Sequence, residues 1–343
     1  MKLFKIPALM TGMLILLTGC GENPNTSSEK HERGIFAMDT YMNLTAYGDN
    51  AETALDKSSE RIMELESIFS VTSENSDIWC INNSDGNPVD VSDDAAEIIS
   101  KAIEYGSLTN GSLDITIYPV LKEWGFTTGD YKVPDNKTIE SLLGNVDYNK
   151  IILNDITVSV PENYQIDLGS LAKGYTGDKV IAELKENGIK SAIISLGGNV
   201  QAIGLKPDGS KWKVSVRNPL SPDINMCIIE IDGKAVITSG NYERYFTAND
   251  GKNYCHIIDP SDGFPADNGL VSVTIIGESG IMCDALSTAL FIMGNENAKD
   301  YWRKNGGFDM ILVTDDGKIT YTDGLADSLE NISSMPAEVI SRE

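Results

Sequence analysis

Positive charge is scarce in this sequence. Its 343 residues carry 51 acidic and 27 basic side chains, which gives a formal net charge of −24 at pH 7. A surface of this sign repels phosphate groups and argues against nucleic-acid binding. A diphosphate ligand would meet the same repulsion unless a metal ion or a cluster of N–H donors offset it. The charge balance therefore directs the search toward a metal site.

Cysteine and histidine are also few. None of the cysteines after residue 20 has the CxxC spacing of a zinc ribbon or a thioredoxin-like motif. These residues can be small buried side chains or, outside the cytoplasm, disulfide partners. They are Cys80, Cys227, Cys255 and Cys283. Of two histidines, His31 falls in a polar segment, so His256 is the one expected in the folded region. An imidazole with a pKa near 6.5 can accept a proton at neutral pH, although a single histidine can equally be structural.

The N-terminal segment has the pattern of a targeting signal. Lys2 and Lys5 precede an apolar stretch over about residues 6–17, which is shorter than the roughly 20 residues of a spanning helix. Leu17-Thr18-Gly19-Cys20 then resembles the lipobox of bacterial lipoproteins, in which the chain is cut before the cysteine and its thiol carries diacylglycerol. An ordinary signal peptide with a chance cysteine is the alternative.

This pattern predicts three consecutive N-terminal parts. We expect a signal peptide over residues 1–19, followed by a lipidated Cys20 and a flexible tether over residues 20–33, which is polar and contains Pro24. The protein is then expected outside the cytoplasm, anchored by lipid to the bacterial cell membrane.

Helical patterns dominate the first part of the folded region and short strands the second. Apolar spacing predicts helices over residues 50–69, 91–108, 171–187 and 283–293. Alternating or β-branched runs predict strands over residues 41–47, 192–196, 200–205, 212–216, 228–231, 236–238 and 271–276, with hairpins over 151–160 and 308–322. This order favours a single α+β domain over residues 34–331, with a largely antiparallel sheet flanked by helices and a frayed tail over 332–343.

Asp284 and Thr288 are the first pair that could carry chemistry. They lie four residues apart in the predicted helix 283–293, so they share one face near its first turn. A carboxylate and a hydroxyl are hard oxygen ligands, which Mg²⁺ commonly combines with phosphate and water. The same spacing also suits a helix-terminal charge and a packed threonine. Spacing alone leaves both interpretations open.

Residues 165–175 combine a turn with a positive charge. A predicted strand passes through Gly169 into a helix start, where free N–H groups together with Lys173 favour an anion. The segment matches neither a Walker loop nor GxGxxG, and an ordinary strand-to-helix turn has the same features. Other glycines, Gly197 and Gly198, permit close backbone approach without identifying a ligand.

Taken together and in order, these segments resemble the ApbE family of FAD:protein FMN transferases. The matching segments are residues 38–40, 112–126, 167–175, 196–199, 238–246, 256–265 and 272–294, which span nearly the whole expected domain. Lipoprotein signals are common in that family, in agreement with Cys20. The resemblance implies one ApbE-type, T-fold-like domain.

The resemblance also implies a set of site residues. The metal ligands would be Asp284, Thr288 and the backbone carbonyl of Ala172, holding Mg²⁺, with Mn²⁺ or Ca²⁺ as alternatives. His256 would be the catalytic base and Asp284 the catalytic metal-binding carboxylate. The residues implied for the FAD pocket are Met38, Asp114, Lys173, Gly197, Gly198, Asn199, Gly240, His256 and Ile257.

The implied reaction is Mg²⁺-dependent cleavage of the FAD diphosphate. FMN would pass through a phosphoester bond to a Thr or Ser hydroxyl of a target flavoprotein, and AMP would leave. Hydrolysis of FAD to FMN and AMP is one alternative, and a flavin-binding lipoprotein without catalysis is another. The expected partners are FAD, the target flavoprotein and the membrane through the lipid anchor, with no nucleic acid.

Overall fold

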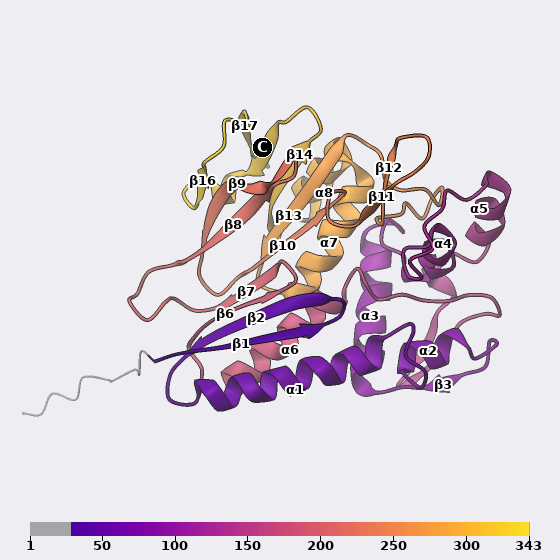
Figure 1. The fold of residues 1–343 in the computed structure, drawn as a ribbon, viewed down its shortest axis with the longest axis horizontal. Helices are drawn as coiled ribbons and strands as arrows, with labels where there is room; N and C mark the ends of the chain where they lie inside the picture. The colour runs from indigo at the N-terminus through magenta and orange to yellow at the C-terminus, as the bar shows by residue number, and fades with distance from the viewer. Residues whose placement is uncertain (1–28, 343) are drawn as a thin grey trace, which may run out of the picture.

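One large sheet organises the protein. The computed structural model describes residues 29–342, and nine strands within them form a sheet in the order β1-β2-β6-β7-β10-β13-β14-β15-β17 (Figure 1). Neighbouring strands are antiparallel except β15 and β17, which are parallel. The strands are β1 (Lys30–Ala37), β2 (Thr40–Tyr47), β6 (Ser191–Leu196), β7 (Asn199–Ile203), β10 (Ala235–Gly240), β13 (Leu270–Gly277), β14 (Asp309–Thr314), β15 (Ile319–Thr322) and β17 (Ala337–Ile340).

Helices cover one face of this sheet. α1 (Ala51–Phe69) and α6 (Ala172–Glu186) pack on β1, β2 and β6, while α7 (Gly280–Met293) packs on β10 and β13 (Figure 1). α8 (Asn295–Asn305) follows α7, and α3 (Asp93–Leu108) contacts both α1 and α7. The helices thereby bring the start of α6 against α7 beside the middle of the sheet.

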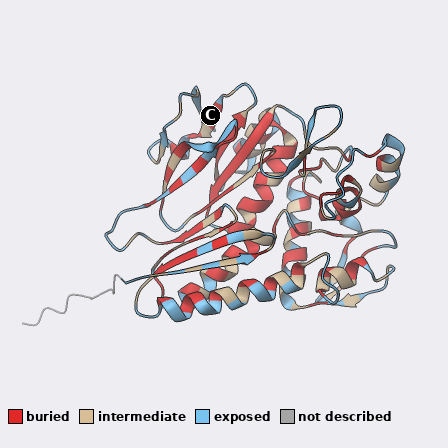
Figure 2. Ribbon diagram, in the orientation of Figure 1, coloured by how far each residue is buried: buried red, intermediate tan, exposed pale blue. Residues whose placement is uncertain are grey.

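A small sheet covers part of the opposite face. It contains β16 (Leu329–Asn331), β9 (Ser221–Ile231) and β8 (Trp212–Asn218), in that order. Its apolar side chains share a core with β10, β13, β14 and β15. The central strands are consequently buried on both faces, and all eight residues of β13 are buried (Figure 2). This explains the near-continuous apolar, β-branched sequence of that strand.

Smaller elements gather at one end of the large sheet (Figure 1). They are α2 (Asp77–Asn82), α4 (Tyr118–Trp124), α5 (Asn136–Leu143), β3 (Val89–Asp90), β4 (Ile152–Asn154), β5 (Thr157–Ser159), the hairpin of β11 (Tyr245–Thr247) and β12 (Asn253–Cys255), and the 3₁₀ turns η1 (Ile115–Ile117) and η2 (Tyr148–Lys150). A further 3₁₀ turn, η3 (Asp323–Leu325), follows β15. Aromatic rings of α4 and the hairpin pack together here, which fixes the hairpin against the domain.

The expected α+β class and largely antiparallel sheet are confirmed, but both predicted domain ends are wrong. Residues 30–33 belong to β1 rather than to a tether, and Arg33 binds Asp56 of α1 at 2.7 Å. The tail is not frayed, because β17 pairs with β15 and Ile340 is buried in the core. The expected signal peptide, Cys20 and most of the tether lie outside the described residues.

The helix predicted over residues 283–293 begins earlier than expected. α7 starts at Gly280 because Ser279 accepts a hydrogen bond from the Met282 N–H, and the Asp178 carboxylate accepts from Gly280 and Ile281 at 2.6 and 3.0 Å. Asp284 therefore lies in the second turn of the helix, not the first. The helices α2, α4, α5 and α8 were not predicted from the pattern.

Two further observations concern possible membrane spans and the cysteines. In the part of the chain that the structure describes, no helix is both long enough and apolar enough to span a membrane. The four described cysteines are unpaired, with Cys227, Cys255 and Cys283 buried. This supports the interpretation of these three residues as small core side chains.

Candidate active site

The first turn of α6 packs closely against the first two turns of α7 at Gly174. A Cβ atom placed on Gly174 would lie 2.4 Å from the Gly280 carbonyl oxygen and 2.6 Å from Cβ of Asp284. No side chain fits at that distance, so the helix backbones approach more closely here than other residues would permit. The approach brings Lys173, in the first turn of α6, close enough to act on the pKa of Asp284, and Ala172 lies in the same turn.

Asp284 is a buried carboxylate. Its residue is 4% exposed, and its Oδ2 accepts a hydrogen bond from the Gly174 N–H at 2.8 Å. Burial raises the pKa of Asp284, while Lys173, the Gly174 N–H and the Asn199 side chain act in the opposite direction. A carboxylate that is kept from water and only partly compensated is a favourable position for a cation.

Thr288 and Ala172 offer oxygen ligands of the types that a hard cation takes. Thr288 follows Asp284 by one helical turn and is half-buried, and Ala172 opens α6. Carboxylate, hydroxyl and carbonyl oxygens are the ligand types that Mg²⁺ takes, and substrate oxygens and water complete such sites. Within residues 29–342 no group of three or more His, Cys, Asp or Glu side chains could hold a metal ion by itself.

The Asn199 side chain is a further polar group beside the Asp284 carboxylate. Its residue is 4% exposed, and its Nδ2 makes no regular hydrogen bond within the described residues. The same side chain lowers the pKa of Asp284, so it lies close to that carboxylate. A buried amide donor beside a carboxylate is suited to bind an oxygen atom of an anionic ligand.

His256 has a defined tautomer. Its Nδ1 lies 3.1 Å from the carbonyl oxygen of Arg244, and because a carbonyl can only accept, Nδ1 carries the hydrogen. Nε2 is left without a hydrogen and can accept a proton. Burial, together with the charges of Lys173 and Arg244, lowers the pKa of His256 to about 4. At neutral pH the ring is thus an uncharged base.

Lys173 is the common neighbour of the candidate groups. Its charge acts on the pKa values of four of them, Asp167, Glu243, His256 and Asp284, which come from four different segments. Arg244 acts on Asp167 and His256 and forms an ion pair with Asp39 at 3.9 Å. In a chain of net charge −24, this pair of cations is a candidate position for an anion.

The structure adds residues to the predicted site. Asp167, Glu243 and Arg244 were not among the predicted residues, although each lies in a segment that carries the family resemblance. Burial raises the pKa of both Asp167 and Glu243. The sequence could have indicated these residues by their positions. Asp167 lies within residues 167–175 together with Lys173, and Glu243 and Arg244 lie within residues 238–246, ahead of His256.

Met38, Gly197 and Gly198 belong to two turns that pack together. Met38 and Asp39 form the β1–β2 turn with φ of 49° and 58°, a conformation that costs energy for side chains other than glycine. Gly197, at φ 61°, lies against Thr40, where a Cβ would approach to 2.6 Å. The Met38 sulfur also accepts a hydrogen bond from Thr176 of α6 at 3.8 Å, so this turn reaches the same helix as Lys173.

Three predicted pocket residues have clear framework contacts. Asp114 accepts hydrogen bonds from the Thr116 N–H and hydroxyl and from the Tyr148 N–H at 2.8, 2.5 and 2.9 Å, so both of its oxygens hold the local chain. The Ile257 side chain is buried in the core. A Cβ on Gly240 would lie 2.4 Å from the Tyr242 ring. Their contact with FAD stays a prediction.

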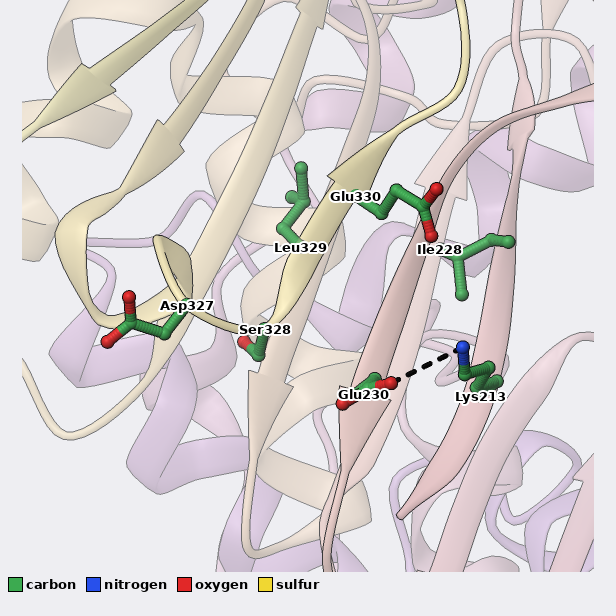
Figure 3. A pocket seen from close by; sticks show the side chains of 7 residues that line it. All are labelled: Lys213, Ile228, Glu230, Asp327, Ser328, Leu329 and Glu330. Atoms are coloured by element: carbon green, nitrogen blue, oxygen red, sulfur yellow. Dashed lines mark ion pairs between the residues drawn. The ribbon is translucent and has the colours of Figure 1, made fainter. Parts of the chain in front are cut away.

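The hollow in Figure 3 is a separate feature. It lies on the small sheet and is lined by Lys213, Ile228, Glu230, Asp327, Ser328, Leu329 and Glu330. Lys213 and Glu230 form an ion pair across it at 3.4 Å. None of the residues of the candidate active site contributes to this hollow.

Comparison with known proteins identifies relatives of similar length. A protein of Klebsiella pneumoniae named FAD:protein FMN transferase is 34% identical over 259 residues, covering 74% of this chain and 79% of the relative. A Vibrio cholerae protein of the same name is 32% identical over 316 residues, covering 89% and 92%. Both alignments include most of the described fold.

Solved structures have the same fold. The ApbE protein of Thermotoga maritima superimposes with a TM-score of 0.81 at 32% identity, over 86% of this chain and 98% of that one. The flavinyl transferase ApbE of Pseudomonas stutzeri, in its apo form, gives 0.76 at 27% identity, over 83% and 91%. The model of the ApbE family matches residues 38–312. The chain belongs to the ApbE family.

Proposed function

We propose that this protein is an FAD:protein FMN transferase that cleaves the FAD diphosphate and attaches FMN to a Thr or Ser hydroxyl of a target flavoprotein. The observation that carries the proposal is the position of Lys173, which acts on both a neutral His256 and a buried Asp284. One cation thus links a proton acceptor to a carboxylate suited to metal binding. Transfer of a phosphoryl-linked group to a hydroxyl requires both.

His256 removes the proton from the acceptor hydroxyl. Nε2 takes the proton from the hydroxyl as its oxygen forms a bond to the FMN-side phosphorus, and the bond from that phosphorus to the oxygen of AMP breaks. AMP departs with the electron pair of that bond. General-base assistance of this kind contributes roughly 10²–10⁴ in rate. Because Nδ1 is held by Arg244, the ring presents Nε2 in one orientation.

Substrate charge offers a way to tune this base. Burial lowers the pKa of His256 most, and the charges of Lys173 and Arg244 lower it further. A diphosphate bound at these two cations would offset the effect of the charges and raise the pKa of His256. The histidine would then be a stronger base with FAD in place than without it.

Asp284, Thr288 and the Ala172 carbonyl would hold Mg²⁺, and Mn²⁺ or Ca²⁺ accept similar oxygen ligands. When bound there, the metal would neutralise the diphosphate and stabilise the charge that develops on the leaving oxygen. Asn199, whose buried amide lies beside Asp284, could donate to a phosphate oxygen.

The test uses the purified chain with FAD, Mg²⁺ and a protein that bears a Thr acceptor motif. Covalent flavin fluorescence on the acceptor after denaturing electrophoresis is the expected result, with AMP released in equal amount. Free FMN and AMP without labelling would indicate hydrolysis of FAD by the same groups. Intact bound FAD would indicate a binding protein and overturn the proposal.

His256→Ala is the matched variant for this experiment. It should retain FAD binding and lose labelling, because the proposed role of His256 is proton transfer rather than affinity. Asp284→Ala should lose the dependence on Mg²⁺. Normal labelling by His256→Ala would remove the histidine from the mechanism.

We also propose that the protein acts outside the cytoplasm, anchored to the cell membrane through lipid on Cys20. The support is the Leu17-Thr18-Gly19-Cys20 sequence after an apolar stretch. Incorporation of labelled palmitate by the intact chain, and its loss in Cys20→Ser, is the expected outcome. Equal labelling of both proteins would contradict the anchor.

A further inference from the structure

Three side-chain hydroxyls meet between β10 and α7. The Ser239 Oγ of β10 lies 2.8 Å from the Ser287 Oγ and 3.2 Å from the Thr288 Oγ1, both on α7. Ser287 continues the series, since its Oγ donates to the carbonyl oxygen of Asp284 at 2.9 Å. These contacts connect the Thr288 side chain and the main chain of Asp284 to a neighbouring strand.

The direction of donation along this chain of three hydrogen bonds follows from the number of hydrogens that each group can donate. Each hydroxyl has one hydrogen to donate, and a carbonyl oxygen has none. Ser287 donates to the Asp284 carbonyl, so it must accept from Ser239. Ser239 has then used its only hydrogen and must accept from Thr288. The order of donation is Thr288 to Ser239 to Ser287 to the Asp284 carbonyl.

We propose that Ser239 and Ser287 are positioning residues that turn the Thr288 hydroxyl into an acceptor-only ligand for a divalent cation. The hydrogen of Thr288 points to β10, so the lone pairs of Oγ1 are left for the cation. A hydroxyl without such a partner would have to give up its other orientations when a cation binds, whereas the hydrogen bond to Ser239 fixes the hydrogen away from the cation beforehand. This inference rests on the proposed metal site and adds the residues that prepare it.

The two serines act by different routes. Loss of the Ser239 hydroxyl removes the acceptor for Thr288. Loss of the Ser287 hydroxyl leaves both of the other hydroxyls in place but frees the hydrogen of Ser239, which can then donate to Thr288 and reverse the series. Ser287 is fully buried, so it can affect a bound cation only through its neighbours.

The experiment measures metal binding rather than catalysis. Mn²⁺ is titrated into the full-length chain saturated with ADP, and free Mn²⁺ is followed by electron paramagnetic resonance against a protein-free ADP reference. Ser239→Ala and Ser287→Ala should each weaken Mn²⁺ binding by roughly 10-fold, as removal of partners behind a metal ligand commonly does. Ser239→Thr, which keeps the hydroxyl, should restore most of the affinity.

Thr238→Val provides the matched control. Thr238 precedes Ser239 on the same strand and makes one comparable bond, from its Oγ1 to the Thr274 Oγ1 at 2.8 Å, away from α7. It should bind Mn²⁺ as the unmodified chain does. Equal affinity in all variants would overturn the positioning role while leaving the transferase proposal intact. Absence of protein-dependent Mn²⁺ binding in the unmodified chain would overturn the metal site itself.

Discussion

The carbonyl oxygen of Arg244 accepts two hydrogen bonds from His256, one from the main-chain N–H and one from Nδ1, both at 3.1 Å. Arg244 precedes β11 and His256 follows β12, so this double contact closes the base of the hairpin. One main-chain atom thereby fixes both the position of the histidine and its tautomer. The guanidinium group takes no part in this contact and forms an ion pair with Asp39 at 3.9 Å.

His256 should make stability depend on pH. Folding lowers its pKa from 6.5 to about 4, so between these values the unfolded chain binds a proton that the folded chain does not. The stability that depends on His256 is complete above pH 6.5 and is lost as pH falls toward 4. The loss is at most on the order of 3 kcal/mol.

His256→Gln isolates this contribution, since glutamine does not titrate. Urea unfolding of both proteins across this range should show the unmodified chain losing more stability than the variant on acidification. Parallel curves for the two proteins would mean that folding does not change the pKa of His256.

Lys173→Met should affect both FAD binding and the histidine. The charge of Lys173 lowers the pKa of His256, so its removal should raise that pKa. Loss of one charged contact to the diphosphate should weaken FAD binding by roughly 10-fold or more. Histidine titration by NMR and flavin fluorescence measure the two effects.

Lys179→Met is the matched control, because Lys179 lies in the same helix but pairs with Glu97 at 2.7 Å. Lys179→Met should leave the pKa of His256 and the affinity for FAD unchanged. If the two lysine variants behaved alike, the effect would come from the overall charge of the protein rather than from the site.

The sequence could predict what depends on local spacing. Asp284 and Thr288 share a helix face because they are four residues apart, and this holds although the helix begins three residues earlier than expected. The earlier start could not be foreseen, because the carboxylate that caps Gly280 belongs to Asp178, 102 residues away in sequence. The effects of Arg244 and Glu243 likewise depend on packing between distant segments. β17 was missed because its short sequence gains its order from pairing with β15.

Asp284→Asn should stabilise the protein in the absence of metal. Burial raises the pKa of Asp284, which means that its ionised form is unfavourable in the fold at neutral pH. The amide keeps an oxygen for the Gly174 N–H and removes the charge, so we expect a gain of about 1 kcal/mol. Thermal unfolding in EDTA should show a higher midpoint for the variant.

The same substitution should abolish stabilisation by Mg²⁺ and FAD together. The unmodified chain should show a rise in its midpoint when both are added, and Asp284→Asn should show little. A lower midpoint for the variant in EDTA would indicate that the carboxylate is stabilised by its neighbours, contrary to the argument from burial.

Gly174→Ala tests whether close approach of α6 and α7 is needed for activity. The added methyl would lie 2.4 Å from the Gly280 carbonyl oxygen, a main-chain atom that can move only with its helix. Overpacking of this kind costs about 1–3 kcal/mol, against a gain of up to about 1 kcal/mol from replacing glycine within a helix. The Gly174 N–H also donates a hydrogen bond to Asp284. Separating the helices should therefore cause a large loss of FMN transfer and only a small loss of thermal stability.

Gly177→Ala separates the effect of helix propensity from the effect of moving α6 away from α7. It brings the same gain in helix propensity one turn later in α6. Its methyl would meet the Gln201 Nε2 at 2.1 Å, the end of a side chain that can rotate away at the expense of its hydrogen bond to the Gly174 carbonyl. We expect near-normal FMN transfer for Gly177→Ala and a large loss for Gly174→Ala, measured by labelling of the acceptor and by thermal unfolding. Similar activity in both variants would show that the site tolerates a wider separation of the helices, and that Asp284 is positioned by α7 alone.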